Sequence, residues 1–131
     1  MKKITKTNQE WHEQLSSEQF HVLREAGTER PFTGKYVNTK EDGTYVCAAC
    51  GNQLFSSEAK FDSRSGWPSY WDVINRGNVE SHQDNSLGMA RTEVNCAKCG
   101  GHLGHVFEDG PRDKTGLRYC INSAALDFKP D

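Results

Sequence analysis

The first two dozen residues carry apolar positions at helical spacing, each set preceded by capping residues. In a capping box, a Ser or Thr side chain and a Glu or Gln three residues later bond each other's backbone N–H groups at the start of a helix. The sequence contains two matches, Thr7 with Glu10 and Ser16 with Gln19. Apolar residues follow each match, namely Trp11, Leu15, Phe20 and Leu23. The pattern predicts two short helices that end near Gly27.

From Pro31 onward the pattern changes to short apolar stretches separated by Gly, Asn, Asp and Pro, which is typical of hairpins and loops. We expect strands at 43–47, 53–55, 69–73, 89–94, 103–107 and 117–126, with a turn at 109–116. The sequence therefore predicts a mainly β protein of antiparallel strands that follows two short helices.

Composition and charge narrow the class of protein. The 131 residues, 34% of them hydrophobic, match a single domain (1–131) with one core. Sixteen basic and 18 acidic residues give a net charge of -2, which does not favour nucleic acid or an anionic membrane as partner. No apolar run is long enough to span a membrane. We expect a cytoplasmic monomer that acts on a small molecule or a protein.

Four of the five cysteines form two C-x2-C pairs, Cys47 with Cys50 and Cys96 with Cys99. In a chain without an export signal, such pairs are typical thiolate ligands of tetrahedral zinc. Glycine follows both pairs and permits the tight turn that directs two sulfurs at one ion. We predict one structural zinc, which is not catalytic because four thiolates leave no open position. A redox pair of thioredoxin type is the alternative, but it requires a following helix.

The fifth cysteine, Cys120, lies in a predicted strand where side chains alternate between two faces. Arg118, Cys120 and Asn122 share one face, and a guanidinium near a thiol favours the nucleophilic thiolate. The alternative is a buried, inert cysteine.

Two further segments contain candidate site residues. His102 and His105 are three apart, so a regular strand sends them to opposite faces, and they converge only if Gly104 bends or bulges it. Histidine can exchange protons near neutral pH, although either residue alone can equally be a packing residue. Trp67 lies in a rigid Gly-Trp-Pro turn, where its ring can receive an S-methyl group or simply pack in the core.

Together, these segments resemble the zinc-containing methionine-R-sulfoxide reductases of class B, the peptide-methionine (R)-S-oxide reductases. The strings that carry the resemblance are FTGKY at 32–36, GWPS at 66–69, LGMARTEV at 87–94, HLGHVF at 102–107 and RYCINSAAL at 118–126, with both cysteine pairs. The resemblance implies a tent-like fold of two antiparallel sheets with short N-terminal helices, held together by the zinc. It covers nearly everything after the first two dozen residues.

The resemblance also implies a reaction on oxidised protein methionine. The Cys120 thiolate attacks the sulfoxide sulfur and becomes a sulfenic acid. The implied supporting residues are His102 and His105 at the sulfoxide oxygen, Asn122 for orientation, Arg118 with Asp109 for thiolate electrostatics, and Trp67 for the substrate methyl.

One position departs from the family. Many members carry a recycling cysteine where this sequence has Ser65, and a serine hydroxyl cannot form a disulfide. With four cysteines assigned to zinc, we expect thioredoxin or a small thiol to reduce the Cys120 sulfenic acid directly. Two other readings of the sequence are a zinc-ribbon binding module and a thiol peroxidase.

Overall fold

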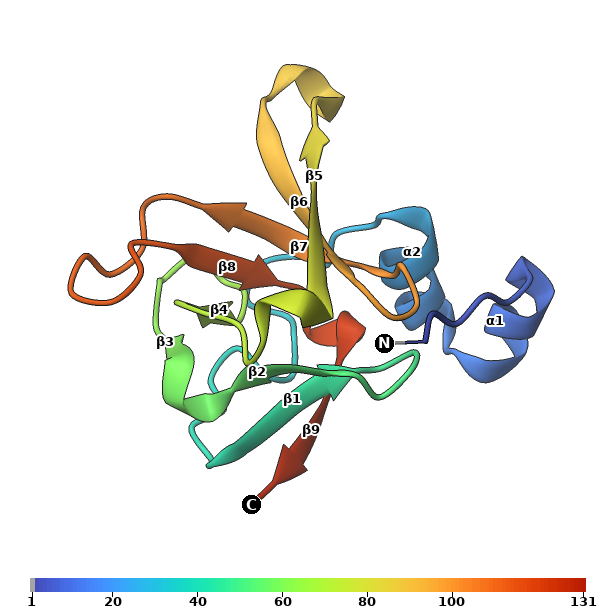
Figure 1. Cartoon of the computed structure of the whole chain (residues 1–131), viewed down its shortest axis with the longest axis horizontal. Coiled ribbons are helices and arrows are strands. Elements are labelled where there is room, and N and C mark those ends of the chain that lie inside the picture. Colours follow the sequence, from blue (N-terminus) through green and yellow to red (C-terminus); the bar gives the residue numbers. More distant parts are fainter. Residues whose placement is uncertain (1) are drawn as a thin grey trace.

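The computed structural model describes residues 2–131 and contains both predicted helices, α1 (Asn8–Gln14) and α2 (Ser17–Glu25). Both capping boxes are formed, and each cap contributes about 1 kcal/mol to stability. The second helix ends at Glu25 and is capped by Ala26, whose backbone is left-handed with φ 54°. The two helices lie together at one side of the sheets (Figure 1).

The strands form two antiparallel sheets, as the sequence predicts (Figure 1). The smaller sheet has the order β2 (Gln53–Ser56), β1 (Gly43–Cys47), β9 (Leu126–Pro130). The larger has the order β3 (Lys60–Phe61), β4 (Ser69–Tyr70), β8 (Arg118–Ile121), β7 (His102–Phe107), β6 (Arg91–Cys96), β5 (Val79–Asp84). Short 3-10 turns lie at Ser57–Ala59, Arg76–Asn78, Ser86–Gly88 and Ser123–Ala125.

Three expectations about the strands were wrong in detail. The predicted strand 117–126 is two strands in different sheets, because the turn Ser123–Ala125 carries the chain from β8 to β9. The predicted strand 69–73 ends at Tyr70. Strands β3 and β5 were not predicted. The β5–β6 hairpin, yellow to orange in Figure 1, rises above the rest of the larger sheet.

Aromatic side chains fill the space between the sheets. Tyr45 and Phe55 from the smaller sheet are fully buried against Tyr70 from the larger one. The Phe55 and Tyr70 rings stack at 4.3 Å between centroids, and Tyr45 meets Tyr70 edge-on at 5.3 Å. Such pairs add about 0.5–1.5 kcal/mol beyond the burial of apolar area. Helix α2 contacts β7 and the turn at Ser123–Ala125, so it covers the end of the larger sheet that carries the predicted site.

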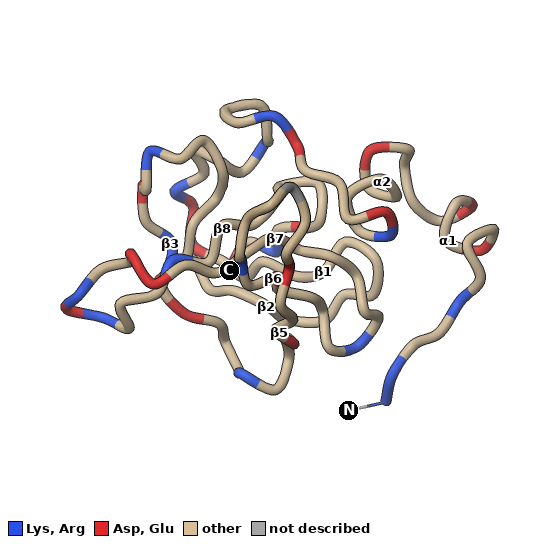
Figure 2. The backbone as a smooth tube through the Cα atoms, turned by 90° about the horizontal axis from the view of Figure 1, so that it is seen from above, with Lys and Arg blue, Asp and Glu red and all other residues tan. Residues whose placement is uncertain are grey.

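Charged residues of both signs are interspersed along the backbone (Figure 2). Within residues 2–131, no helix combines the length and apolar character needed to cross a membrane.

Candidate functional site

The four paired cysteines meet in one cluster, with their sulfur atoms all within 4.8 Å of one another. The Sγ atoms of Cys47 and Cys99 are 3.7 Å apart, and those of Cys50 and Cys96 are 3.6 Å apart. Four sulfurs at the usual zinc bond length around one tetrahedral ion are about 3.8 Å from one another. These distances exclude disulfides in this structure and fit a zinc ion held by four thiolates.

The two cysteine pairs adopt the same local turn. Gly51 donates its N–H to Cys47 O and Gly100 donates to Cys96 O, both at 2.8 Å. The backbone of Gly51 has φ 78° and that of Gly100 has φ 76°, a region in which glycine is unstrained. The glycines that follow the pairs therefore have the role predicted from the sequence.

This cluster joins the two sheets. Cys47 is the last residue of β1 in the smaller sheet, and Cys96 is the last residue of β6 in the larger sheet. A metal ion held here therefore ties together strands that are far apart in the sequence, as expected of a structural site.

The fifth cysteine lies apart from the cluster, on a cavity of about 240 Å³. Side chains alternate between the two faces of β8, and the three predicted to share one face, Arg118, Cys120 and Asn122, all line this cavity. The pairing of Ser69 with Cys120 brings the preceding turn alongside, so Ser65 and Trp67 form the facing wall. Cys120 and Trp67 are both partly exposed, so neither is an ordinary core residue.

The Cys120 thiol has a serine hydroxyl as its nearest polar partner. Its Sγ lies 3.7 Å from Ser65 Oγ, and Ser65 in turn contacts Ser63 Oγ at 2.8 Å. Burial raises the pKa of the Cys120 thiol, while the bond to Ser65 and the charge of Arg118 lower it. Arg118 thus acts in the predicted direction, but desolvation outweighs it, because moving a thiolate out of water is costly.

Arg118 is itself paired with Asp109. Arg118 Nε donates to Asp109 Oδ1 at 2.9 Å and its Nη2 donates to Oδ2 at 3.2 Å. The Asp109 side chain is 66% exposed and is not among the cavity-lining residues. Its charge raises the pKa of Cys120, opposite to the predicted support of the thiolate, so its contribution is to hold the guanidinium in place.

The two histidines converge through the irregularity that their spacing requires. On β6, Val94 pairs with Gly104 while the next residue, Asn95, pairs with His102, so Leu103 is an extra residue in β7. This bulge turns both imidazoles to one face, with ring centroids 5.5 Å apart. A Cβ at Gly104 would collide with the backbone carbonyl of Cys120, so only glycine permits this approach of β7 to β8.

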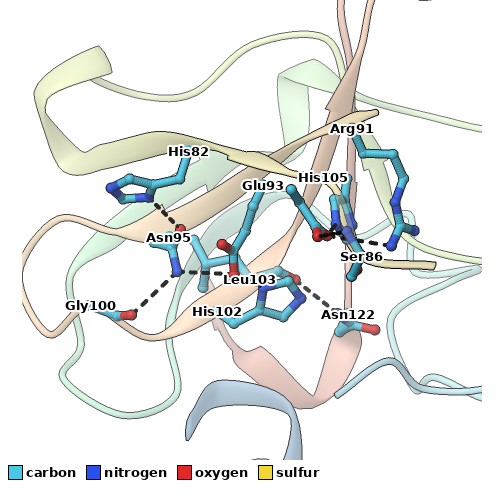
Figure 3. Close-up of polar contacts among 11 residues, drawn as sticks. His82, Ser86, Arg91, Glu93, Asn95, Gly100, His102, Leu103, His105 and Asn122 are labelled. Carbon is cyan, nitrogen blue, oxygen red and sulfur yellow. Dashed lines mark hydrogen bonds and ion pairs between the residues drawn. The ribbon is translucent and has the colours of Figure 1, made fainter. Parts of the chain in front are cut away.

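Each imidazole is held by a carboxylate from the β5–β6 hairpin (Figure 3). His102 Nδ1 lies 2.5 Å from Glu93 Oε2, and His105 Nε2 lies 2.8 Å from Asp84 Oδ2. The bond from His105 is the main cause of the lowered Asp84 pKa. Only His105 lines the Cys120 cavity, and both histidines line an adjoining hollow.

His102 has one nitrogen without a partner. The side chain is 5% exposed, and its Nε2 is buried without a hydrogen bond. Burial lowers the pKa of His102, against the hydrogen bond and charge of Glu93, which raise it. A buried nitrogen without a hydrogen bond costs about 1–3 kcal/mol of folding free energy in a protein. Such an atom is therefore a candidate to form a hydrogen bond with a ligand or a water.

Asn122 and Trp67 are fixed by the same segment of chain. Asn122 Nδ2 donates to Leu103 O at 3.0 Å, and its Oδ1 accepts the N–H of Glu29 at 3.0 Å. Trp67 Nε1 donates to Glu29 O, also at 3.0 Å. The Glu29 carboxylate accepts the N–H of Ala124 and is thereby attached to the turn after β8. One residue therefore sets the positions of the indole and the amide on opposite sides of the cavity.

The sequence did not reveal the polar residues that hold the two histidines, Asn122 and Trp67 in place. Asp84, Glu93 and Glu29 do not themselves form a recognisable spacing with the histidines or with Cys120. The one available signal was the string LGMARTEV at 87–94, which contains Glu93 one residue before the predicted end of a strand. Their roles depend on strand pairing and on a loop contact, neither of which a linear pattern specifies.

The chain matches the family model described as the SelR domain over residues 15–130. It is 57% identical over 128 residues to the peptide methionine sulfoxide reductase MsrB of Agrobacterium fabrum, covering 98% of this chain and 94% of that protein. The protein of the same name from Methanosarcina mazei is 58% identical over 126 residues, covering 96% and 89%. That from Acinetobacter baylyi is 56% identical over 131 residues, covering 100% and 94%. The chain therefore belongs to the SelR family, the class B methionine sulfoxide reductases that its motifs resemble.

Proposed function

We propose that the whole chain, 1–131, acts as one reductase domain that converts methionine-R-sulfoxide in proteins to methionine. The observation that carries the proposal is the thiol of Cys120, which stands outside the four-cysteine cluster and opens onto a cavity walled by Trp67 and His105. The printed names of the relatives, peptide methionine sulfoxide reductase, agree with this chemistry.

The first step transfers one oxygen atom. The substrate methyl packs on the Trp67 ring, and the Cys120 sulfur attacks the sulfoxide sulfur. The sulfur–oxygen bond of the substrate breaks, and the oxygen ends on Cys120 as a sulfenic acid. The Cys120 sulfur is oxidised by two electrons, and the sulfur of the departing methionine is reduced by the same two. The acid gives one proton to the sulfoxide oxygen and the thiol gives up another. One of these two protons stays in the sulfenic hydroxyl, and the other returns to the acid.

Histidine supplies and receives the proton in this scheme. Asp84 accepts from His105 Nε2, which leaves Nδ1 of that ring for the cavity, and Glu93 leaves Nε2 of His102 free. His105 is the better candidate for the proton donor, because it alone of the two lines the Cys120 cavity. Asn122 orients the sulfoxide, and Arg118, held by Asp109, stabilises negative charge at Cys120.

The second step regenerates the thiol. One external thiol attacks the Cys120 sulfenic acid with loss of water, and a second thiol breaks the mixed disulfide. Thioredoxin supplies both thiols in one molecule, and two small monothiols supply them separately. Ser65 supports this route, because the side chain that contacts the Cys120 sulfur at 3.7 Å carries a hydroxyl, which cannot form a disulfide with the sulfenic acid.

Zinc has a structural role in this proposal. Cys47, Cys50, Cys96 and Cys99 would hold one ion, which would cross-link the two sheets and take no part in the oxygen transfer. None of the five cysteines forms a disulfide, which suits a reducing compartment such as the cytoplasm. The Cys120 cavity brings together the thiol, the indole of Trp67 and the imidazole of His105, and we propose that the protein acts as a monomer.

An epimer-resolved assay tests the proposed reaction. We expect the zinc-loaded protein with a thioredoxin system to consume the R epimer of a methionine sulfoxide racemate and leave the S epimer unchanged. Chiral chromatography of the remaining sulfoxide measures this. Consumption of hydrogen peroxide in preference to either epimer would instead identify a thiol peroxidase, and consumption of neither would favour a binding module.

Intact-mass analysis tests the recycling route. After oxidation by substrate without reductant, we expect the protein to gain one oxygen atom, located on Cys120 by peptide mapping. A disulfide between Cys120 and one of the four clustered cysteines would contradict the direct external route.

The matched control for this experiment is Ser65→Cys. Because the hydroxyl lies 3.7 Å from the Cys120 sulfur, a thiol at position 65 is within reach for a disulfide after modest rearrangement. We expect this variant to lose two hydrogens where the native protein gains an oxygen.

A further inference from the structure

Phe32 is a large apolar residue that the fold leaves in solvent. Its side chain is 70% exposed, more than that of Ile74 or Met89, the other exposed large apolar residues of the described chain. Its backbone has φ 67°, in the left-handed region that residues with a side chain rarely adopt. Neither property contributes to a folded core, and unusual backbone conformations are concentrated at functional sites.

The loop after Ser65 holds Phe32 in this position. Phe32 donates its N–H to Gly66 O at 2.7 Å. Gly66 has φ 94°, and a Cβ there would lie 2.6 Å from Pro31 Cβ and 3.0 Å from the Phe32 ring. The Phe32 ring therefore rests on the Gly66 backbone, directly beside Trp67 in the chain.

Phe32 also lines a second hollow, of about 180 Å³, together with Val37, Phe61, Arg64 and Trp67. Trp67 is at the same time a wall of the Cys120 cavity. The two hollows thus share the indole as a common wall. The larger one contains the reacting thiol. The smaller one has no thiol or histidine, and its lining is apolar at Phe32, Val37, Phe61 and Trp67 and polar at Asn38, Asp62, Ser63 and Arg64.

We propose that the Phe32 hollow binds an apolar side chain next to the methionine sulfoxide in a polypeptide substrate. This inference rests on the proposed function. If the sulfoxide side chain enters the Cys120 cavity, its own backbone must remain at the rim. Successive Cα atoms are about 3.8 Å apart, so a neighbouring side chain can reach across Trp67 to the ring of Phe32. Binding would cover the exposed ring and favour leucine or phenylalanine over glycine at that position.

Three substrates distinguish binding of a neighbouring side chain at Phe32 from the chemical step at Cys120. They are N-acetyl-methionine-R-sulfoxide amide, a pentapeptide with methionine-R-sulfoxide between leucines, and the same pentapeptide with glycines instead. The native protein is expected to have a higher kcat/KM for the leucine peptide than for the glycine peptide. Phe32→Ala should lower kcat/KM for the leucine peptide about tenfold and leave the other two within about twofold, because only that contact is lost.

Two variants serve as controls. Phe32→Leu keeps an apolar side chain and should retain most of the preference. Ile74→Ala removes an exposed apolar residue, 42% exposed, that lines neither hollow, and should change none of the three values. Circular dichroism and the thermal midpoint show whether each variant is folded.

The inference is overturned if the native protein treats the two peptides alike, or if Phe32→Ala lowers kcat/KM equally for all three substrates. Failure of the native protein to reduce even the N-acetylated amino acid would instead contradict the proposed function itself.

Discussion

Replacing Cys120 by serine is expected to reduce sulfoxide reduction by at least about 10⁴-fold, the scale on which loss of a nucleophile acts. Serine cannot accept the oxygen, since the product would require an oxygen–oxygen bond in place of a sulfenic acid. The side chain is nearly the same size and only partly buried, so the fold should be unaffected. Formation of N-acetyl-methionine amide from N-acetyl-methionine-R-sulfoxide amide, followed by chromatography, measures the effect.

Two measurements make the Cys120→Ser result specific. The variant should keep its metal content, because Cys120 is outside the four-cysteine cluster, and its thermal midpoint should be unchanged. Substantial remaining activity in a preparation free of the native protein would remove Cys120 from its assigned role.

Removing the metal is expected to have the largest effect on stability. Structural zinc sites with thiolate ligands bind with about 10–16 kcal/mol, whereas a domain is stable by only about 5–15 kcal/mol in total. Cys96 is fully buried at the junction of the two sheets, and without an ion the four sulfurs lose the charge that holds them together. We expect Cys96→Ser, or prolonged chelation, to abolish the cooperative thermal transition.

Metal content and the near-ultraviolet circular dichroism of the same samples check this expectation. The Cys120→Ser protein is a suitable control, because it removes one cysteine and leaves the cluster complete. A chelated protein that kept its thermal midpoint would show that the aromatic core alone holds the sheets together. Re-addition of zinc should restore the transition if the chelated chain has not aggregated.

The sequence alone correctly predicted those features in which a short local pattern is compatible with only one structure. Thr7 with Glu10 and Ser16 with Gln19 cap helices as predicted, because a capping box is complete within four residues. The two C-x2-C pairs meet as predicted, and the glycine after each one adopts the positive φ that its tight turn requires. The sequence predicted that His102 and His105 could converge only if Gly104 made the strand irregular, and the bulge in β7 meets that condition.

Other features depend on contacts between distant segments and were missed for that reason. Strand β5 is largely polar and solvent-exposed on both faces, so it has no apolar alternation, yet it supplies the Asp84 carboxylate. The net effect of burial on the Cys120 pKa likewise depends on neighbours from other strands. The break between β8 and β9 falls at Ser123–Ala125, where small buried residues form a compact turn within an otherwise strand-like sequence.

The order of the strands has a consequence for how the protein reaches its native state. β1 pairs with β9 and β4 pairs with β8, so each sheet is completed by a segment from near the carboxyl end of the chain. Pairings of such large sequence separation form slowly, because the loop between them must close first. During synthesis on the ribosome, the amino-terminal cysteine pair emerges long before its partner. The Cys120 thiol therefore becomes shielded only in the last stage of folding, and until then it is open to unwanted oxidation.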